Sequence, residues 1–186
     1  MIGLVLGGAD NLWPDIEAFR RLYDGPVLVF ATNDAAAQYP GRVDYFVSRH
    51  ANIAFRWREM RAARGLNMDF EFCSCKGTEQ MAGVDSTLDV PSGGTGMLAV
   101  RKAQLHTPKQ VLCGVPMDAR RHIDGSIADD AGQPWKSCIK FRPAWMQWLK
   151  DHPDDAARVR SMSGWTRREF GYPDAEWFSE PVRKAG

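Results

Sequence analysis

The sequence predicts an α/β protein: a Rossmann-like three-layer αβα sandwich with a mostly parallel central sheet. Three observations support this fold class. Short apolar runs alternate with segments of helical periodicity as far as Asp118, the pattern of strands joined by helical crossovers. Several of these runs are continuous, which is typical of strands buried on both faces of a parallel sheet. The chain has 186 residues, 44% of them hydrophobic and 25% charged, enough for one domain with a full-sized core.

The first half of the chain supplies four of the predicted strands. Residues 2–6 form a continuous apolar run that ends at Gly7 and Gly8, which predicts a buried strand followed by a tight turn. Residues 15–23 carry apolar side chains on one helical face, and Pro14 suits the first turn of that helix. The other predicted elements of this half are strands at 27–31, 43–47 and 68–73 and helices at 33–37 and 53–64.

The second half is less regular. A loop is predicted over 74–90, and beyond Asp118 the polar segment 119–134 is predicted to form a loop or lid over the sheet edge. The other predicted elements are helices at 95–105, 144–149 and 165–170, strands at 110–114 and 159–162, a helical turn at 154–158 and a loosely packed tail from Tyr172. All belong to one domain, 1–186, with a core (1–118), a loop or lid (119–142) and C-terminal helices and tail (143–186).

The composition argues against several classes of protein. A formal net charge of +1 gives no long-range attraction to nucleic acid or to an anionic membrane. The sequence lacks the pattern of a signal peptide and any apolar run long enough for a membrane span. Its four cysteines lack the spacing of a zinc site, and Asp118, Asp124, Asp129 and Asp130 lack that of a calcium loop. We therefore expect a cytoplasmic protein with reduced cysteines and no bound metal.

The segment most informative for function is a glycine-rich turn made of Ser92, Gly93, Gly94 and Thr95. It stands where the predicted helix 95–105 begins, so N–H groups without helical partners and the positive end of the helix dipole form an anion site. Glycine lets a phosphate approach the backbone closely, and Ser92 or Thr95 can cap the helix or donate a hydroxyl. The turn predicts binding of a nucleotide or another phosphate compound.

Two other turns are predicted at the same sheet edge. Gly7 and Gly8 follow the first strand, where a nucleotide phosphate or ribose commonly meets backbone N–H groups, although GxGxxG and the P-loop lysine are both missing. Asn33 follows the second strand and can bond a base or ribose through its donor and its acceptor. Each also has a structural interpretation: the glycine pair as a plain turn, Asn33 as a helix cap. Both interpretations are open at this point.

The candidate catalytic residues lie beyond the predicted strand 110–114. His122 on the predicted lid is the best placed of the four histidines for general acid or base catalysis, because imidazole titrates near neutral pH; the alternative is a solvent-exposed loop histidine. Asp118 is the acidic candidate. Arg49 and His50 after the third strand can reach an anionic ligand or form a surface turn. The seven tryptophans are expected in the core or at an interface rather than as a base-stacking platform.

Four segments together resemble the Rossmann-like, glycosyltransferase-like family of bacteria and phages. This family includes bacterial sialyltransferases and proteins similar to 6-hydroxymethylpterin diphosphokinases. The segments are LVLGGADNL, FATND, PSGGTGMLAV with QVLCGVPM, and VRSMSGWT. The family's first turn is usually Gly-x-Gly-Pro-Ser-Leu, and this chain lacks its second glycine, its proline and its serine. The combination looks most like a phage or prophage member of the family.

The resemblance implies that Asn33 and the turn Ser92-Gly93-Gly94 contact a nucleotide, and that His122 is the nearest counterpart of the family's histidine base. The leading hypothesis is a nucleotide-sugar-dependent glycosyltransferase that uses the donor as substrate and needs no cofactor. Helix-end N–H groups would stabilise the leaving phosphate without a metal while the base deprotonates the acceptor hydroxyl. A phage-encoded protein of this kind would work in the host cytoplasm or in the virion.

Two alternatives come from other functional classes. The first is a non-catalytic domain that binds a nucleotide or a partner, such as a phage structural or accessory protein that forms homo-oligomers or joins a phage particle. The degenerate first turn favours this alternative. The second is a phosphotransferase or nucleotide hydrolase that uses acidic residues near Asp118, although neither a P-loop nor a paired-metal pattern is present.

Overall fold

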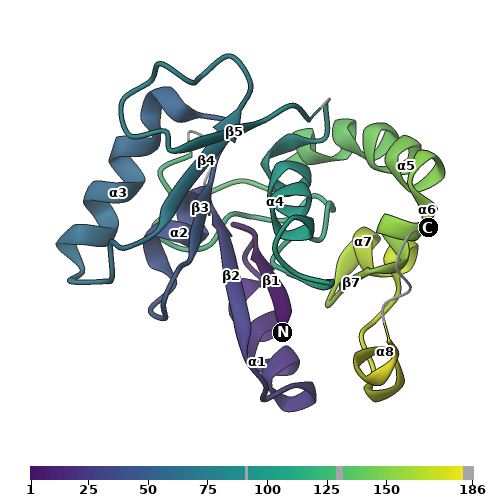
Figure 1. Cartoon of the computed structure of the whole chain (residues 1–186). Helices are drawn as coiled ribbons and strands as arrows, with labels where there is room; N and C mark the ends of the chain where they lie inside the picture. The colour runs from purple at the N-terminus through teal and green to yellow at the C-terminus, as the bar shows by residue number, and fades with distance from the viewer. Residues whose placement is uncertain (91, 129–131, 182–186) are drawn as a thin grey trace.

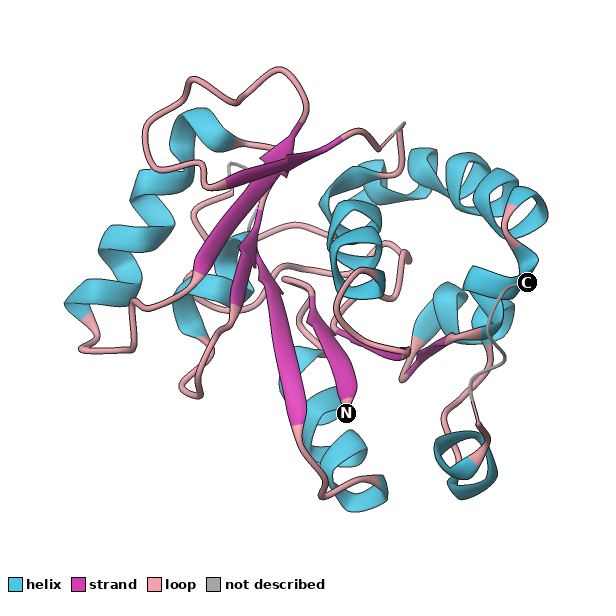
Figure 2. Ribbon diagram, in the orientation of Figure 1, coloured by secondary structure: helices cyan, strands magenta, loops and turns pink. Residues whose placement is uncertain are grey.

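Seven parallel strands form one sheet in the part of the chain that the computed structural model describes, residues 1–90, 92–128 and 132–181. The strand order is β5-β4-β3-β2-β1-β6-β7, and each neighbouring pair is parallel. Helices cover both faces of this sheet (Figure 1 and Figure 2). The predicted α/β fold class, a three-layer sandwich around a parallel sheet, is therefore confirmed.

The elements alternate along the chain much as the sequence predicts. The strands are β1 Ile2–Leu6, β2 Val27–Thr32, β3 Tyr45–Val47, β4 Glu71–Cys75, β5 Ser86–Leu88, β6 Lys109–Cys113 and β7 Val159–Ser161. The α-helices are α1 Leu12–Leu22, α2 Asn33–Gln38, α3 Ala54–Ala63, α4 Gly94–Gln104, α5 Arg142–Asp151, α6 Pro153–Ala157, α7 Gly164–Phe170 and α8 Ala175–Ser179. Two 3₁₀ helices, η1 Ala51–Ile53 and η2 Lys136–Phe141, complete the described set.

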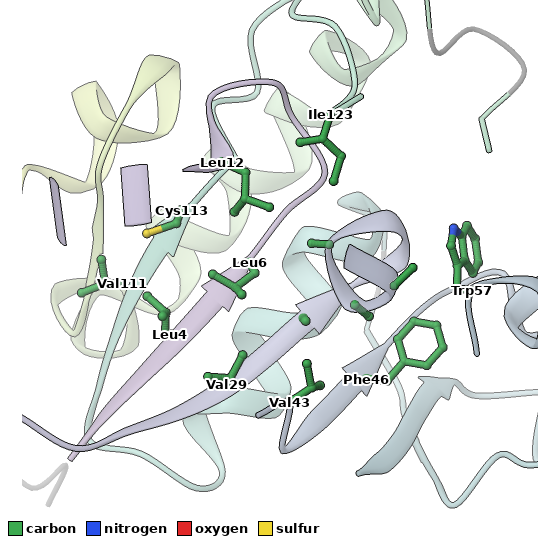
Figure 3. Packing of buried hydrophobic residues seen from close by; sticks show 14 of the residues in the cluster. Leu4, Leu6, Leu12, Val29, Val43, Phe46, Trp57, Val111, Cys113 and Ile123 are labelled. Atoms are coloured by element: carbon green, nitrogen blue, oxygen red, sulfur yellow. The ribbon is translucent and has the colours of Figure 1, made fainter. Parts of the chain in front are cut away.

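The two layers of helices are held by two hydrophobic cores, one on each face of the sheet. Side chains alternate between the faces along a strand, so Leu4 and Leu6 enter one core and Val5 the other. The first core, part of which is drawn in Figure 3, receives side chains from α1, α2, α3 and α8. The second receives side chains from α4, α5, α6 and α7. All five residues of β1 are buried, as expected for a central parallel strand.

The strand order changes direction at β1, which places a crevice there. From β1 the chain adds β2, β3, β4 and β5 on one side, and then crosses by α4 to place β6 on the other side. The carboxyl ends of the two central strands are joined, because Gly7 N donates to Cys113 O (2.8 Å) and Ala9 N donates to Gly114 O (3.2 Å). In open α/β sheets, ligands bind outside the carboxyl ends of the strands at such a switch point.

Three predictions about individual elements are wrong. The segment 74–90, predicted as a loop, contains β5, a three-residue edge strand too short and too polar to produce an apolar run. The segment 119–142, predicted as a loop or lid, contains η2 and the first residue of α5, Arg142. The described part of the tail, 172–181, is not loosely packed, because it contains α8, whose Trp177 is only 4% exposed.

The described part of the tail is held by a lysine that the sequence analysis did not single out. Lys109 of β6 is buried, and its ammonium donates hydrogen bonds to the carbonyl oxygens of Trp177 and Glu180 at the end of α8. A cation that binds the last carbonyls of a helix also interacts favourably with the helix dipole. Four tryptophans of the second half belong to the core rather than to an interface: Trp145, Trp148, Trp165 and Trp177.

Candidate functional site

A pocket of about 800 Å³ opens at the carboxyl end of the sheet, around the switch point between β1 and β6. Its volume is in the range of small-molecule sites. All nine candidate residues of the sequence analysis line it: Gly7, Gly8, Asn33, Ser92, Gly93, Gly94, Thr95, Asp118 and His122. They come from segments far apart in the chain, and the parallel topology brings them together. That they bind a nucleotide stays a prediction.

The glycine-rich turn opens α4 toward the pocket, but neither of its hydroxyl groups caps the helix. The helix begins at Gly94, with Gly93 as the N-cap at φ 139°, and none of the described side chains bonds the cap position. The expectation that Ser92 or Thr95 caps α4 is therefore wrong: the N-cap position belongs to Gly93, whose φ of 139° is a conformation that residues with a Cβ atom rarely adopt. The N–H groups of the first turn and the positive dipole end remain available to an anion in the pocket.

Asn33 has the features of a ligand-binding residue rather than of a cap. Thr32 occupies the N-cap position of α2, so the cap interpretation is wrong. Asn33 adopts φ 44°, a left-handed conformation that is uncommon outside glycine and that asparagine tolerates better than most residues. Its Oδ1 atom is buried and has no hydrogen-bond partner among the described residues. An uncommon backbone conformation beside a buried acceptor without a partner calls for an explanation, and a ligand in the pocket is one.

The two glycines after β1 differ in their surroundings. A Cβ atom on Gly7 would lie 2.3 Å from Gly114 O, so this position allows the backbones after β1 and β6 to pack together. A Cβ atom on Gly8 would meet nothing closer than 3.9 Å, its neighbours being Asp34 and His122 Nδ1. Gly7 therefore has a structural role, whereas Gly8 faces space in the pocket.

The segment 119–128 forms a fixed wall of the pocket. It pairs with the turn after β1, since Asp10 N donates to Arg121 O and Ile123 N donates to Gly8 O, both at 2.9 Å. Ile123 is 2% exposed and enters the first core (Figure 3). The carboxylate of Asp34 also accepts from Ser126 Oγ at 2.6 Å. Residues 119–128 of the predicted loop are thus anchored at several points to the turn after β1 and to Asp34.

Asp129 and Asp130 were also weighed in the sequence, as members of an acidic group. They lie outside the described residues. Among the residues that are described, no group of three or more histidine, cysteine, aspartate or glutamate side chains is arranged to hold a metal ion.

The two candidate catalytic residues stand in different environments. His122 lines the pocket beside Gly8, and its ring centroid is 5.4 Å from that of Trp135. Both carboxylate oxygens of Asp118 are held by the protein: Oδ1 accepts a hydrogen bond from Arg142 at 2.6 Å, and Oδ2 accepts one from Trp165 N at 3.1 Å. This geometry favours His122 for proton transfer and gives Asp118 the role of fixing the start of α7.

Basic side chains dominate the charge of the pocket. Its lining includes four arginines, namely Arg49, Arg56, Arg120 and Arg121. Arg49 also donates to Val90 O at 3.1 Å, which ties the end of β3 to the segment before α4. The lining contains two acidic residues, Asp34 and Asp118, and the carboxylates of both accept hydrogen bonds from protein donors. The sequence analysis missed Arg56, because only the tertiary fold shows which way α3 turns this side chain.

A buried carboxylate below the pocket ties its floor together. Asp15 Oδ2 accepts from Gly114 N (2.9 Å), Asn11 Nδ2 (2.7 Å) and Ser163 Oγ (2.7 Å), which connects the ends of β1, β6 and β7. Ser163 is the N-cap residue of α7, but its hydroxyl is given to Asp15 and not to the helix. Burial raises the pKa of Asp15, and these hydrogen bonds oppose the shift without cancelling it.

Replacement of Asp15 tests this arrangement. Asp15→Ala is expected to lower the free energy of unfolding by about 2 kcal/mol, because three donors lose their acceptor. Asp15→Asn keeps an acceptor oxygen and should cost clearly less. The raised pKa means that the folded protein binds this proton more tightly than the unfolded chain. The stabilisation is therefore complete below the unfolded value of 3.8 and is lost as pH rises through the folded pKa.

Urea unfolding of the wild type and of Asp15→Asn at several pH values from 4 to 8 checks the sign. The advantage of the wild type over the asparagine variant should shrink as pH rises through this window and then stay constant. An advantage that grows with pH would show that the hydrogen bonds outweigh burial at Asp15.

Comparisons of the chain with protein-family models, with curated proteins and with solved structures found no match. The resemblance to the glycosyltransferase-like family therefore rests on its four motifs. Within the described residues, no helix has the length and apolar character needed to cross a membrane. The four cysteines are free thiols, of which only Cys75 is not fully buried.

Proposed function

We propose that this pocket binds a nucleotide sugar and that the protein transfers the sugar to an acceptor hydroxyl. The observation that supports this most is the meeting of three features at one switch point: the open first turn of α4, the unpaired Oδ1 of Asn33 and the basic lining. Helix N–H groups and arginines recognise phosphate, and the asparagine amide can recognise ribose or base. The volume suits a ligand of this size.

The transfer requires few groups. The phosphate of the donor binds at Gly94 and Thr95, where the N–H groups of α4 stabilise the charge that develops as the bond between the sugar and the phosphate oxygen breaks. The acceptor oxygen forms the new bond to the anomeric carbon, and His122 takes its proton. The nucleotide leaves with the electron pair of the broken bond. No metal ion takes part in these steps, so transfer should continue in the presence of a chelator.

A matched pair of variants at Thr95 tests phosphate binding. Thr95 lies in the first turn of α4 and lines the pocket. Thr95→Asp is expected to preserve or raise stability, because an acid in the first turn interacts favourably with the helix dipole. The same charge repels phosphate, so nucleotide binding should be lost. Thr95→Asn is the matched control, because asparagine has nearly the shape of aspartate but no charge. This variant should still bind the nucleotide.

The measurement is a thermal-shift screen against CMP, UDP, GDP, ADP, their sugar conjugates and inorganic phosphate, with and without magnesium. A ligand at 100 times its dissociation constant stabilises the native state by about 2.7 kcal/mol, which gives a clear melting shift. A shift with one nucleotide class in the wild type and Thr95→Asn, absent in Thr95→Asp, would support the site. No shift with any nucleotide would overturn the proposed function.

A further inference from the structure

Trp135 presents an aromatic surface to the pocket. It is half-buried and lines the pocket just before η2. Its backbone is fixed, because Trp135 N donates to Arg120 O at 2.7 Å. Its ring centroid lies 5.4 Å from that of His122 and 6.5 Å from that of Phe141. Three rings from separate turns of the segment after β6 therefore line one side of the pocket.

The other tryptophan of the pocket lining, Trp57, does not present its ring to a ligand as Trp135 does. Trp57 is only 5% exposed, packs edge-on against Phe46, and gives its Nε1 hydrogen to Asp34 at 2.8 Å. It stands on the side of the pocket that also contains Arg49 and Arg56. Arg120 and Arg121 precede His122 in the segment that also carries Trp135, so both sides of the pocket contain cations. Only the side with Trp135 has an indole that is half-buried rather than buried, and this indole suits a flat, weakly polar ring.

The aromatic side adjoins the phosphate site. A Cβ atom on Gly94, the first residue of α4, would lie 3.4 Å from the ring of Phe141, which in turn neighbours Trp135. A ligand with phosphate at the start of α4 can therefore place a group attached through one sugar against the indole. Bases stack on aromatic side chains with little dependence on sequence, because every base has a π-face.

We propose that the indole of Trp135 stacks on the base of the bound nucleotide. The base then lies on the β6 side of the pocket, the phosphate at α4, and the transferred sugar toward His122. This inference rests on the proposed function and adds to it the orientation of the ligand and the residue that selects nucleotides over other sugar phosphates.

The experiment compares ligands with and without a base. Affinities for CMP, UMP, AMP, GMP and ribose 5-phosphate are measured by calorimetry in the wild type and in variants of Trp135. The wild type should prefer its best nucleotide to ribose 5-phosphate by about tenfold or more. Trp135→Leu should lose that preference without weaker binding of ribose 5-phosphate, and Trp135→Phe should keep most of it. Trp13→Leu is the matched control, since Trp13 is 39% exposed and lies outside the pocket lining.

Tryptophan fluorescence gives a second readout that does not depend on the leucine variant being folded. A stacked base should quench the emission of Trp135, so the quenching seen with nucleotide in the wild type should be absent in Trp135→Phe. An unchanged preference in Trp135→Leu, or unchanged quenching in Trp135→Phe, would overturn the inference while the proposed function stands. If neither nucleotides nor ribose 5-phosphate bind the wild type, the proposed function fails and the inference fails with it.

Discussion

Gly7→Ala is expected to lower the free energy of unfolding by about 3 kcal/mol or more, and Gly8→Ala to leave it nearly unchanged. At Gly7 the added methyl group would stand 2.3 Å from Gly114 O and 2.6 Å from Val115 Cγ2. Gly114 O is a backbone atom, so it cannot move aside as a flexible side chain could. The ends of β1 and β6 would have to separate, and the hydrogen bond from Gly7 N to Cys113 O would be strained or lost. Thermal and urea unfolding of both variants measure the difference.

Ligand binding should distinguish the two neighbouring glycines in the opposite way. Here the substitution at Gly8, and not the one at Gly7, is expected to have the direct effect. The methyl group of Gly8→Ala has room in the empty pocket but takes space beside His122 and Asp34, so nucleotide affinity should fall although the protein stays folded. If Gly7→Ala proved as stable as the wild type, the close packing of the two strand ends would be refuted. If Gly8→Ala bound nucleotide normally, the ligand would have to lie away from the turn after β1.

The parts of the fold that the sequence predicts well are those with a strong local signal. The continuous apolar runs of β1, β2 and β6 belong to strands buried on both faces. Gly7 directly follows the run of β1 and Gly114 that of β6, and Asn33 stands one residue after the run of β2. Such signals are weak at the sheet edge. The strand β5 has three half-buried residues, and nothing in Ser86–Leu88 distinguishes it from loop. Only pairing with β4 makes it a strand.

The candidate site could be anticipated for a topological reason. Because the strands are parallel, residues that follow different strands are placed at the same edge, so Gly8, Asn33 and the turn before α4 could be assigned to one site without knowledge of the strand order. The side chains that approach from helices and loops could not be assigned in this way. Arg56 on α3 and Trp135 before η2 carry no local signal, and only tertiary packing turns them toward the pocket.

Asp15 shows a further limit of sequence reasoning. Its position in the first turn of α1 is consistent with an ordinary acidic residue near a helix N-terminus, where the dipole favours it. Its partners Gly114 and Ser163 are 99 and 148 residues away in the sequence. No spacing rule relates such positions. Because these partners follow different strands, the one carboxylate of Asp15 joins three strand ends below the pocket.

His122→Gln is expected to reduce turnover by a factor of about 10² to 10⁴, the usual contribution of a positioned general base, and to leave nucleotide affinity within a few-fold of the wild type. Glutamine keeps a neutral polar side chain of similar reach but cannot take up a proton. The assay is release of nucleotide from the nucleotide sugar that the thermal-shift screen selects. Water serves as acceptor where no other is known, and a chelator is present throughout.

His152→Gln is the matched control, because His152 is exposed at the junction of α5 and α6 and does not line the pocket. It should change neither turnover nor affinity. Equal loss of affinity and turnover in His122→Gln would make His122 a binding residue instead of the base. Tight nucleotide binding by a wild type that releases no nucleotide from any donor would favour the non-catalytic alternative, because the proposed binding uses the turn of α4 and Asn33, whereas the proposed transfer also needs the base.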